Sequence, residues 1–214
     1  MRLEGWLETP AIVALPDQHR SPTARRKAQE LLRRDGAVKV FFIEFQRTAR
    51  TSSQRIADQF GTTLNAAISE MLEQGLDEAH AWEALGSYFQ GLNAQDAQPD
   101  LRSLTATAIG HGIQVLAADM DYDQARAVLK EQNLSEVNLF LSTGLTIRDT
   151  SAASLIAKYL HSATSLETGR LMLWGVNHFT ENVAFSTYCD TRLQILLAQH
   201  GLAVHVATDD EMAP

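Results

Sequence analysis

Two short apolar runs, separated by an amphipathic stretch, constrain the fold of this chain more than any other feature. Residues 11–15 (AIVAL) stop at Pro16, and residues 38–43 (VKVFFI) stop at Glu44. Apolar runs of this length that end at polar residues are typical of buried strands, and the helical spacing between them is typical of an amphipathic helix. The sequence therefore predicts a strand–helix–strand unit with parallel strands.

Later segments continue this alternation of strands and helices. Further strands are expected at residues 113–117, 169–174 and 202–207. Helices are expected at residues 100–109, 122–132, 134–141, 149–160 and 188–200, with a loop at residues 143–148. Two more helical segments within about residues 54–98 indicate a helical insertion. We therefore expect a single α/β domain over residues 1–214, with a mainly parallel β-sheet, helices on both faces, and an acidic, frayed tail at residues 208–214.

Composition and charge narrow the class of protein. The chain is 45% hydrophobic and 21% charged, which is ordinary for a folded domain and argues against disorder. The formal net charge is −8, and the main basic run, residues 25–27 with Arg33 and Arg34, is interpreted as the solvated face of a helix. Nucleic acid is therefore disfavoured as a partner.

The cysteine content and the N-terminus bear on the compartment. The single cysteine, Cys189, excludes an intramolecular disulfide and a multi-cysteine metal cluster. The first residues lack the pattern of a signal peptide, and no run reaches the roughly 18 apolar residues of a membrane span. We expect a cytoplasmic protein without a membrane span; export by a route without a hydrophobic signal is the alternative. The oligomeric state is left open.

Polar residues of catalytic type follow several predicted strands or open a predicted helix. They are Asp17 and His19 after the first strand, Glu44 after the second, Asp119 after the third, Asn177 and His178 after the fourth, and Arg148 with a helix-capping Asp149 at a helix start. Each residue alone has an ordinary structural reading as a cap, a strand end or a loop residue. Parallel strands, however, bring their carboxyl ends to one edge of the sheet, where ligands bind in open α/β folds. Their joint placement predicts one site.

Five motifs, taken in order, resemble a known superfamily. They are LPDQH (residues 15–19), VKVFFIE (38–44), PDLRSLTATAIGHGIQVLAADMD (99–121), IRDTSAASLIAKYL (147–160) and GRLMLWGVNHFTEN (169–182). The chain resembles the group that includes erythromycin esterases, the haem-binding ChaN lipoproteins, the TIKI and TraB proteins, and a domain of dermonecrotic-type toxins. The resemblance spans roughly residues 10 to 207 and implies a hydrolase of an ester or amide bond.

The resemblance also implies roles for individual residues. Carried over by position, His19 would be a general base or metal ligand, Glu44 a base or ligand, and His178 the second imidazole. Asp17 stands where the group's first acid is usual, and Arg148 would hold an anionic group or an oxyanion. Three more residues are expected to support substrate binding: Asp119, Asp149 and Asn177.

The sequence leaves open which cofactor is bound, which substrate is used and whether the site is catalytically active. His19, Glu44 and His178 are candidate ligands of a divalent metal, for which zinc and manganese are equally suitable, and haem is less favoured. The substrate would be a small molecule or a peptide. Pro16 replaces the group's usual glycine and Asp17 its usual glutamate, which removes a backbone N–H and shortens the acid by one methylene. These departures keep open a second reading: a catalytically degenerate binding or effector module of the same fold.

Overall fold

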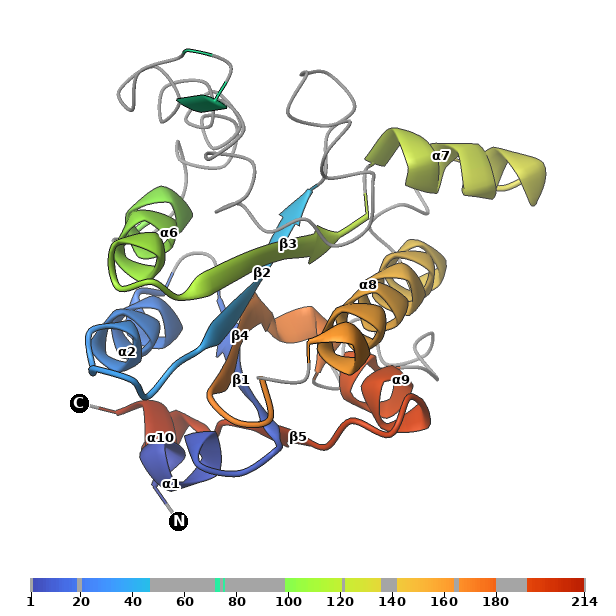
Figure 1. Cartoon of the computed structure of the whole chain (residues 1–214). Helices are drawn as coiled ribbons and strands as arrows, with labels where there is room; N and C mark the ends of the chain where they lie inside the picture. The colour runs from blue at the N-terminus through green and yellow to red at the C-terminus, as the bar shows by residue number, and fades with distance from the viewer. Residues whose placement is uncertain are drawn as a thin grey trace.

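The described part of the protein is built on a five-stranded, all-parallel sheet (Figure 1). This computed structural model describes residues 2–18, 21–46, 72–73, 75, 99–120, 122–135, 142–163, 166–179 and 192–213. The strands are β1 (Ile12–Asp17), β2 (Val40–Gln46), β3 (Gln114–Asp119), β4 (Arg170–Gly175) and β5 (Val204–Val206). They lie in the order β3-β2-β4-β1-β5, and every pairing is parallel. The expected α/β fold is confirmed.

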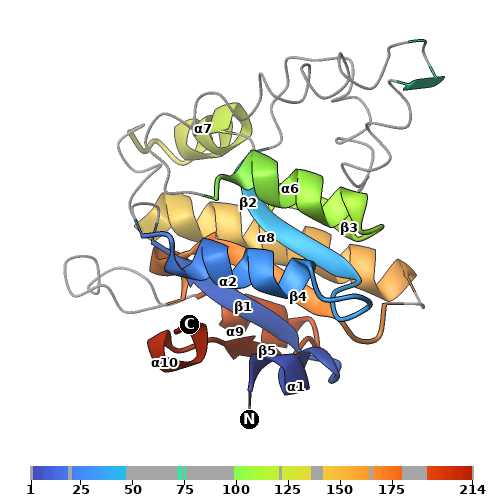
Figure 2. The ribbon, with the colours of Figure 1, turned by 90° about the vertical axis from the view of Figure 1, so that its left-hand side faces the viewer.

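Helices cover both faces of this sheet (Figure 2). One face carries α1 (Leu3–Leu7), α2 (Thr23–Leu32), α6 (Leu101–Gly110) and α10 (Asp209–Met212), and the other carries α8 (Ser142–Ser162) and α9 (Leu193–Gln199). The remaining described helix, α7 (Tyr122–Glu131), contacts α8, and its buried Ala125 and Leu129 pack with Ile147. No helix in the described ranges is long and apolar enough to cross a membrane.

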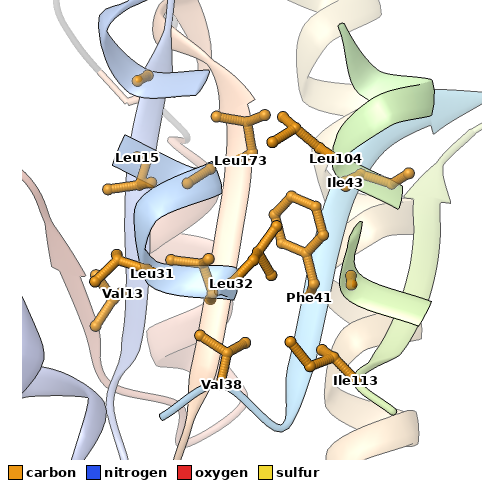
Figure 3. Close-up of a cluster of buried hydrophobic side chains, with 14 of the residues drawn as sticks. Val13, Leu15, Leu31, Leu32, Val38, Phe41, Ile43, Leu104, Ile113 and Leu173 are labelled. Atoms are coloured by element: carbon orange, nitrogen blue, oxygen red, sulfur yellow. The ribbon is translucent and has the colours of Figure 1, made fainter. Parts of the chain in front are cut away.

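The two-residue repeat of the strands divides the core into two layers. Odd-numbered residues such as Leu15, Phe41 and Leu173 pack under α2 and α6 (Figure 3). Even-numbered residues such as Phe42 and Met172 pack under α8 and α9. Successive side chains of a strand point to opposite faces, and both faces here are covered, so the strands are almost continuously apolar. The same alternation directs the even-numbered Glu44 to the α8 face and the odd-numbered Asp17 to the α2 face.

Two local predictions on the described residues are wrong. Residues 143–148, expected as a loop, belong to α8, and Asp149 is therefore inside the helix rather than at its N-cap. Within this extension, Ile147 packs against the buried Ala125 and Leu129 of α7. The tail is not frayed: Thr208 and Glu211 form a reciprocal capping box, and Met212 is buried in the core. The predicted insertion lies outside the described residues, except for 72–73 and 75.

Candidate active site

Five ionisable side chains meet at the carboxyl ends of β2, β3 and β4. We call them the rim cluster: Glu44 from β2, Asp119 from β3, Arg148 and Asp149 from α8, and His178 from the 3₁₀ helix η2 (Val176–His178) that follows β4. Four of these side chains are at most 4% exposed, whereas Glu44 is 14% exposed. Glu44 is therefore the most accessible member. All five were among the predicted site residues, and the structure brings them together.

The sheet order explains how these distant segments converge. β2 lies between β3 and β4 in the sheet, so Glu44 has the end of a neighbouring strand on either side. As an even-numbered residue, Glu44 follows Phe42 toward the face that α8 covers. Arg148 and Asp149 reach the cluster from that helix, and both are buried.

Glu44 is held by three donors. Its Oε1 accepts a hydrogen bond from Arg148 Nη2 at 2.8 Å and lies 3.2 Å from His178 Nε2. Its Oε2 accepts a hydrogen bond from the backbone N–H of Gly175 at 2.6 Å. A Cβ atom at position 175 would stand only 2.7 Å from Glu44 Oε2, so the close approach of the carboxylate depends on glycine.

A buried aspartate anchors each cation that reaches Glu44. Arg148 donates from Nε to Asp119 Oδ1 at 3.0 Å and from Nη2 to Asp119 Oδ2 at 2.6 Å. On the other side, His178 Nδ1 lies 2.5 Å from Asp149 Oδ1. Both contacts join a basic side chain to a carboxylate, which makes them charge-assisted hydrogen bonds. The rim cluster is therefore two aspartate–cation pairs that converge on one oxygen of Glu44.

The surroundings of His178 favour its charged form. Each ring nitrogen faces a carboxylate, and both nitrogens can donate only when the ring is an imidazolium. Burial opposes that charge, but Glu44 and Asp149 outweigh it and raise the pKa of His178 to about 10. Burial also raises the pKa of Asp149, against the effect of His178. The ring keeps the shared proton because it faces a second carboxylate, Glu44.

Burial and a neighbouring cation also act in opposite directions on the pKa of Asp119. Burial raises the pKa of Asp119, and the neighbouring Arg148 opposes this shift. Arg148 is 4% exposed, and its Nε and Nη2 are both directed at carboxylates. The contacts therefore show Arg148 holding Asp119 and Glu44, and its oxyanion role stays a prediction.

Asp17 enters the opposite face of the sheet from Glu44. It is odd-numbered, and on the α2 side it accepts hydrogen bonds from Arg25 Nε at 3.0 Å and Nη2 at 2.8 Å. Both side chains are buried, which corrects the prediction that the whole basic run is solvated. Arg25 stands three and seven residues before the buried Ala28 and Leu32, and hence on the inner side of α2. The catalytic role of Asp17 stays a prediction.

Two predicted site residues fall outside what the structure describes, and the metal prediction depends on one of them. They are His19 and the side chain of Asn177, whose backbone belongs to η2. Within the described residues, no group of three His, Cys, Asp or Glu side chains is arranged to hold a metal ion. Both nitrogens of His178 are directed at carboxylates, and the metal site, which also needs His19, stays a prediction.

Two surface hollows lined by described residues lie away from the rim cluster. A hollow of about 690 Å³ lies among α1, α2 and α10, on the same side of the sheet as Asp17, and is lined by mixed charges. A smaller one of about 250 Å³ lies at the end of β1, beside Pro16, Gln18 and Asp209. These two hollows do not identify the rim cluster, which is recognised by its chemistry instead.

Two neighbours of the rim cluster were not predicted. Gly175 supplies both a backbone donor and the space for Glu44, and Trp174 places its ring against that of His178. A glycine that ends a strand marks a close approach of another group, and this signal was available in the sequence. The role of Trp174 had no such signal, because a buried aromatic residue in a strand is ordinary core.

Comparisons of the chain with protein-family models, with curated proteins and with solved structures give no match. The resemblance to the erythromycin esterase and ChaN group therefore stays a prediction. What the chain does has to be argued from the rim cluster and its chemistry.

Proposed function

We propose that the protein hydrolyses an ester or amide bond at the rim cluster, with the Glu44 carboxylate at the centre of the site. The observation that carries the proposal is the convergence of two anchored cations and a backbone N–H on one partly exposed carboxylate. Burying charges is costly, and apolar residues of similar volume often stabilise a fold as well. Converging ionisable groups at the ligand-binding edge of a parallel sheet therefore favour a functional role.

The arrangement suits water attack on a carbonyl carbon. Glu44 would accept a proton from the attacking water, and the His178 imidazolium would give a proton to the leaving oxygen or nitrogen. Glu44 would then pass its proton to His178 Nε2, which lies 3.2 Å from Glu44 Oε1, and both groups would be restored. Asp149 would keep the ring oriented. His19, the base implied by the resemblance, remains a second acceptor for the water proton.

The test compares Glu44 with a second glutamate that also contacts two cations but lies outside the rim cluster. Glu44→Gln should lower kcat on a panel of p-nitrophenyl esters and short peptides by about a hundredfold or more, the range expected for a lost general base. Glu30→Gln is the control, because Glu30 also contacts two cations, Lys27 and Arg34, but lies exposed on α2. It should change kcat less than twofold. Equal rates for the wild type and Glu44→Gln would refute the proposal.

A binding or effector module without turnover is the second candidate. The observation that favours it is that the two cations of the rim cluster, Arg148 and His178, are already paired with carboxylates. Such a network can hold β2, β3, β4 and α8 together without a substrate. Should the wild type hydrolyse nothing in the panel while Glu44→Gln only lowers the melting temperature, this candidate replaces the hydrolase. A titration with haem, followed by the shift of its Soret absorption band, then tests whether the module binds haem.

A further inference from the structure

Trp174 lies beside the rim cluster but has no role in the site described above. It is the penultimate residue of β4, points to the α8 and α9 face of the sheet and is 0% exposed. Its ring stands perpendicular to that of His178, with 6.1 Å between the ring centroids and 90° between the planes. An edge-to-face contact of this geometry is favourable for aromatic rings.

The plane of the His178 ring is set by rotation about its Cβ–Cγ bond. Asp149 and Glu44 contact ring nitrogens on opposite sides of this axis, so their hydrogen bonds resist the rotation, although hydrogen bonds bend easily. A buried ring packed edge-to-face against the imidazole narrows the rotation further by direct contact. Trp174 provides that contact.

A hydrogen bond from the indole N–H to described residues does not explain why Trp174 lies beside His178. Trp174 Nε1 is buried and finds no hydrogen-bond acceptor in the described part of the chain. Buried indole N–H groups usually have a partner, so the side chain is not held there by a hydrogen bond from Nε1 to described residues. What the residue offers the site is the flat face and edge of its ring.

We infer that Trp174 is a positioning residue, which fixes the plane of the His178 ring so that Nε2 stays directed at Glu44. The inference rests on the proposed function for its catalytic consequence, but its structural content does not. A ring that tilts would weaken the contact of Nε2 with Glu44 and misdirect the proton that His178 donates. Small misplacements of catalytic groups cost large factors in rate.

Three substitutions separate ring packing from general core stability. Trp174→Phe keeps a ring but removes the N–H, Trp174→Leu removes the ring, and Phe42→Leu is the matched control. Phe42 is also fully buried on the α8 face and also makes an edge-to-face contact, with Tyr159 at 6.5 Å, but it is not in the rim cluster. Trp174→Met, which fills the space with a flexible chain, replaces Trp174→Leu if the latter does not fold.

Two readouts are measured on each folded variant: kcat and KM for the best substrate of the panel, and the histidine ring signals in two-bond ¹H–¹⁵N NMR spectra. We expect Trp174→Leu to lower kcat at least tenfold with KM within twofold. It should also change the ¹⁵N shifts or the two-bond pattern of the His178 ring, which report its charge and hydrogen bonds; a small ¹H shift alone would reflect only the lost ring current of the indole. Trp174→Phe should stay within about threefold of the wild-type kcat. Phe42→Leu should leave both readouts unchanged.

Several results would overturn the inference. Unchanged ¹⁵N shifts and an unchanged two-bond pattern of His178 in Trp174→Leu would show that the ring is held without Trp174. An equal loss in Trp174→Phe would assign the effect to the N–H, and an equal loss in Phe42→Leu would assign it to the core in general. If the wild type shows no hydrolysis, the proposed function fails, and the NMR signals still decide whether Trp174 positions the ring.

Discussion

The charge of His178 gives the sharpest quantitative prediction. Between its carboxylate neighbours Asp149 and Glu44, the pKa of His178 is raised to about 10, against 6.5 for an unperturbed imidazole. A group whose folded pKa is raised contributes stability that is complete below the unfolded pKa and is lost as pH rises through the folded pKa. At about 1.4 kcal/mol per pKa unit, the difference corresponds to on the order of 5 kcal/mol.

The pH window of this loss follows from the same two values. Between pH 7 and 9.5 the folded protein holds a proton on His178 that the unfolded chain has released, so the free energy of unfolding should fall as pH rises. His178→Gln removes the titrating group. Urea unfolding at a series of pH values should therefore show the wild type losing about 3 kcal/mol relative to this variant across the window.

The control for this experiment is a second imidazole–carboxylate pair. His205 lies 3.0 Å from Glu211, away from the rim cluster. The difference in pH profile between the wild type and His178→Gln should persist when both carry His205→Gln. Parallel pH profiles for the wild type and His178→Gln would refute the reasoning, because they would mean that the folded protein does not hold a proton on His178 through this range.

Three further substitutions probe the contacts around the sheet. Gly175→Ala should push the Glu44 carboxylate out of place, lowering the free energy of unfolding by about 1–3 kcal/mol in urea titrations and reducing any hydrolysis in parallel. Arg25→Met should cost about 3–5 kcal/mol because it removes a guanidinium from the buried Asp17 carboxylate, and Asp17→Leu in the same chain should restore most of that stability. Met212→Ala should cost about 2–5 kcal/mol and speed proteolysis of the C-terminal segment, in line with a docked tail.

The strands and their polar ends could be predicted because their signals are local. Strands in a sheet covered on both faces are continuously apolar, and the apolar runs of β1, β2 and β3 stop near the carboxyl ends of these strands. The helix before β3 was equally readable: Asp100 caps α6 by accepting a hydrogen bond from Ser103 N at 2.7 Å, and Gly112 turns the chain with a φ of 71°. These features depend on neighbours in sequence.

The pairing of the charged residues could not be predicted, because it depends on the order of strands in the sheet. Nothing in the chain order places β4 next to β2, yet that arrangement brings His178 to Glu44. Arg25 is an intermediate case. Its basic neighbours favoured a solvated face, while its helical spacing from Ala28 and Leu32 indicated burial, and the spacing was the better guide.

The early start of α8 explains how two adjacent residues serve both sides of Glu44. At an N-cap, the Asp149 carboxylate would accept hydrogen bonds from the first backbone N–H groups of the helix. Because α8 starts at Ser142, those donors belong to an earlier turn, and the Asp149 carboxylate binds His178 instead. Consecutive helical residues point about 100° apart, so Arg148 reaches Asp119 at the end of β3 while Asp149 reaches the segment after β4. The helix extension that local sequence did not reveal is therefore what allows both cations to converge on β2 between them.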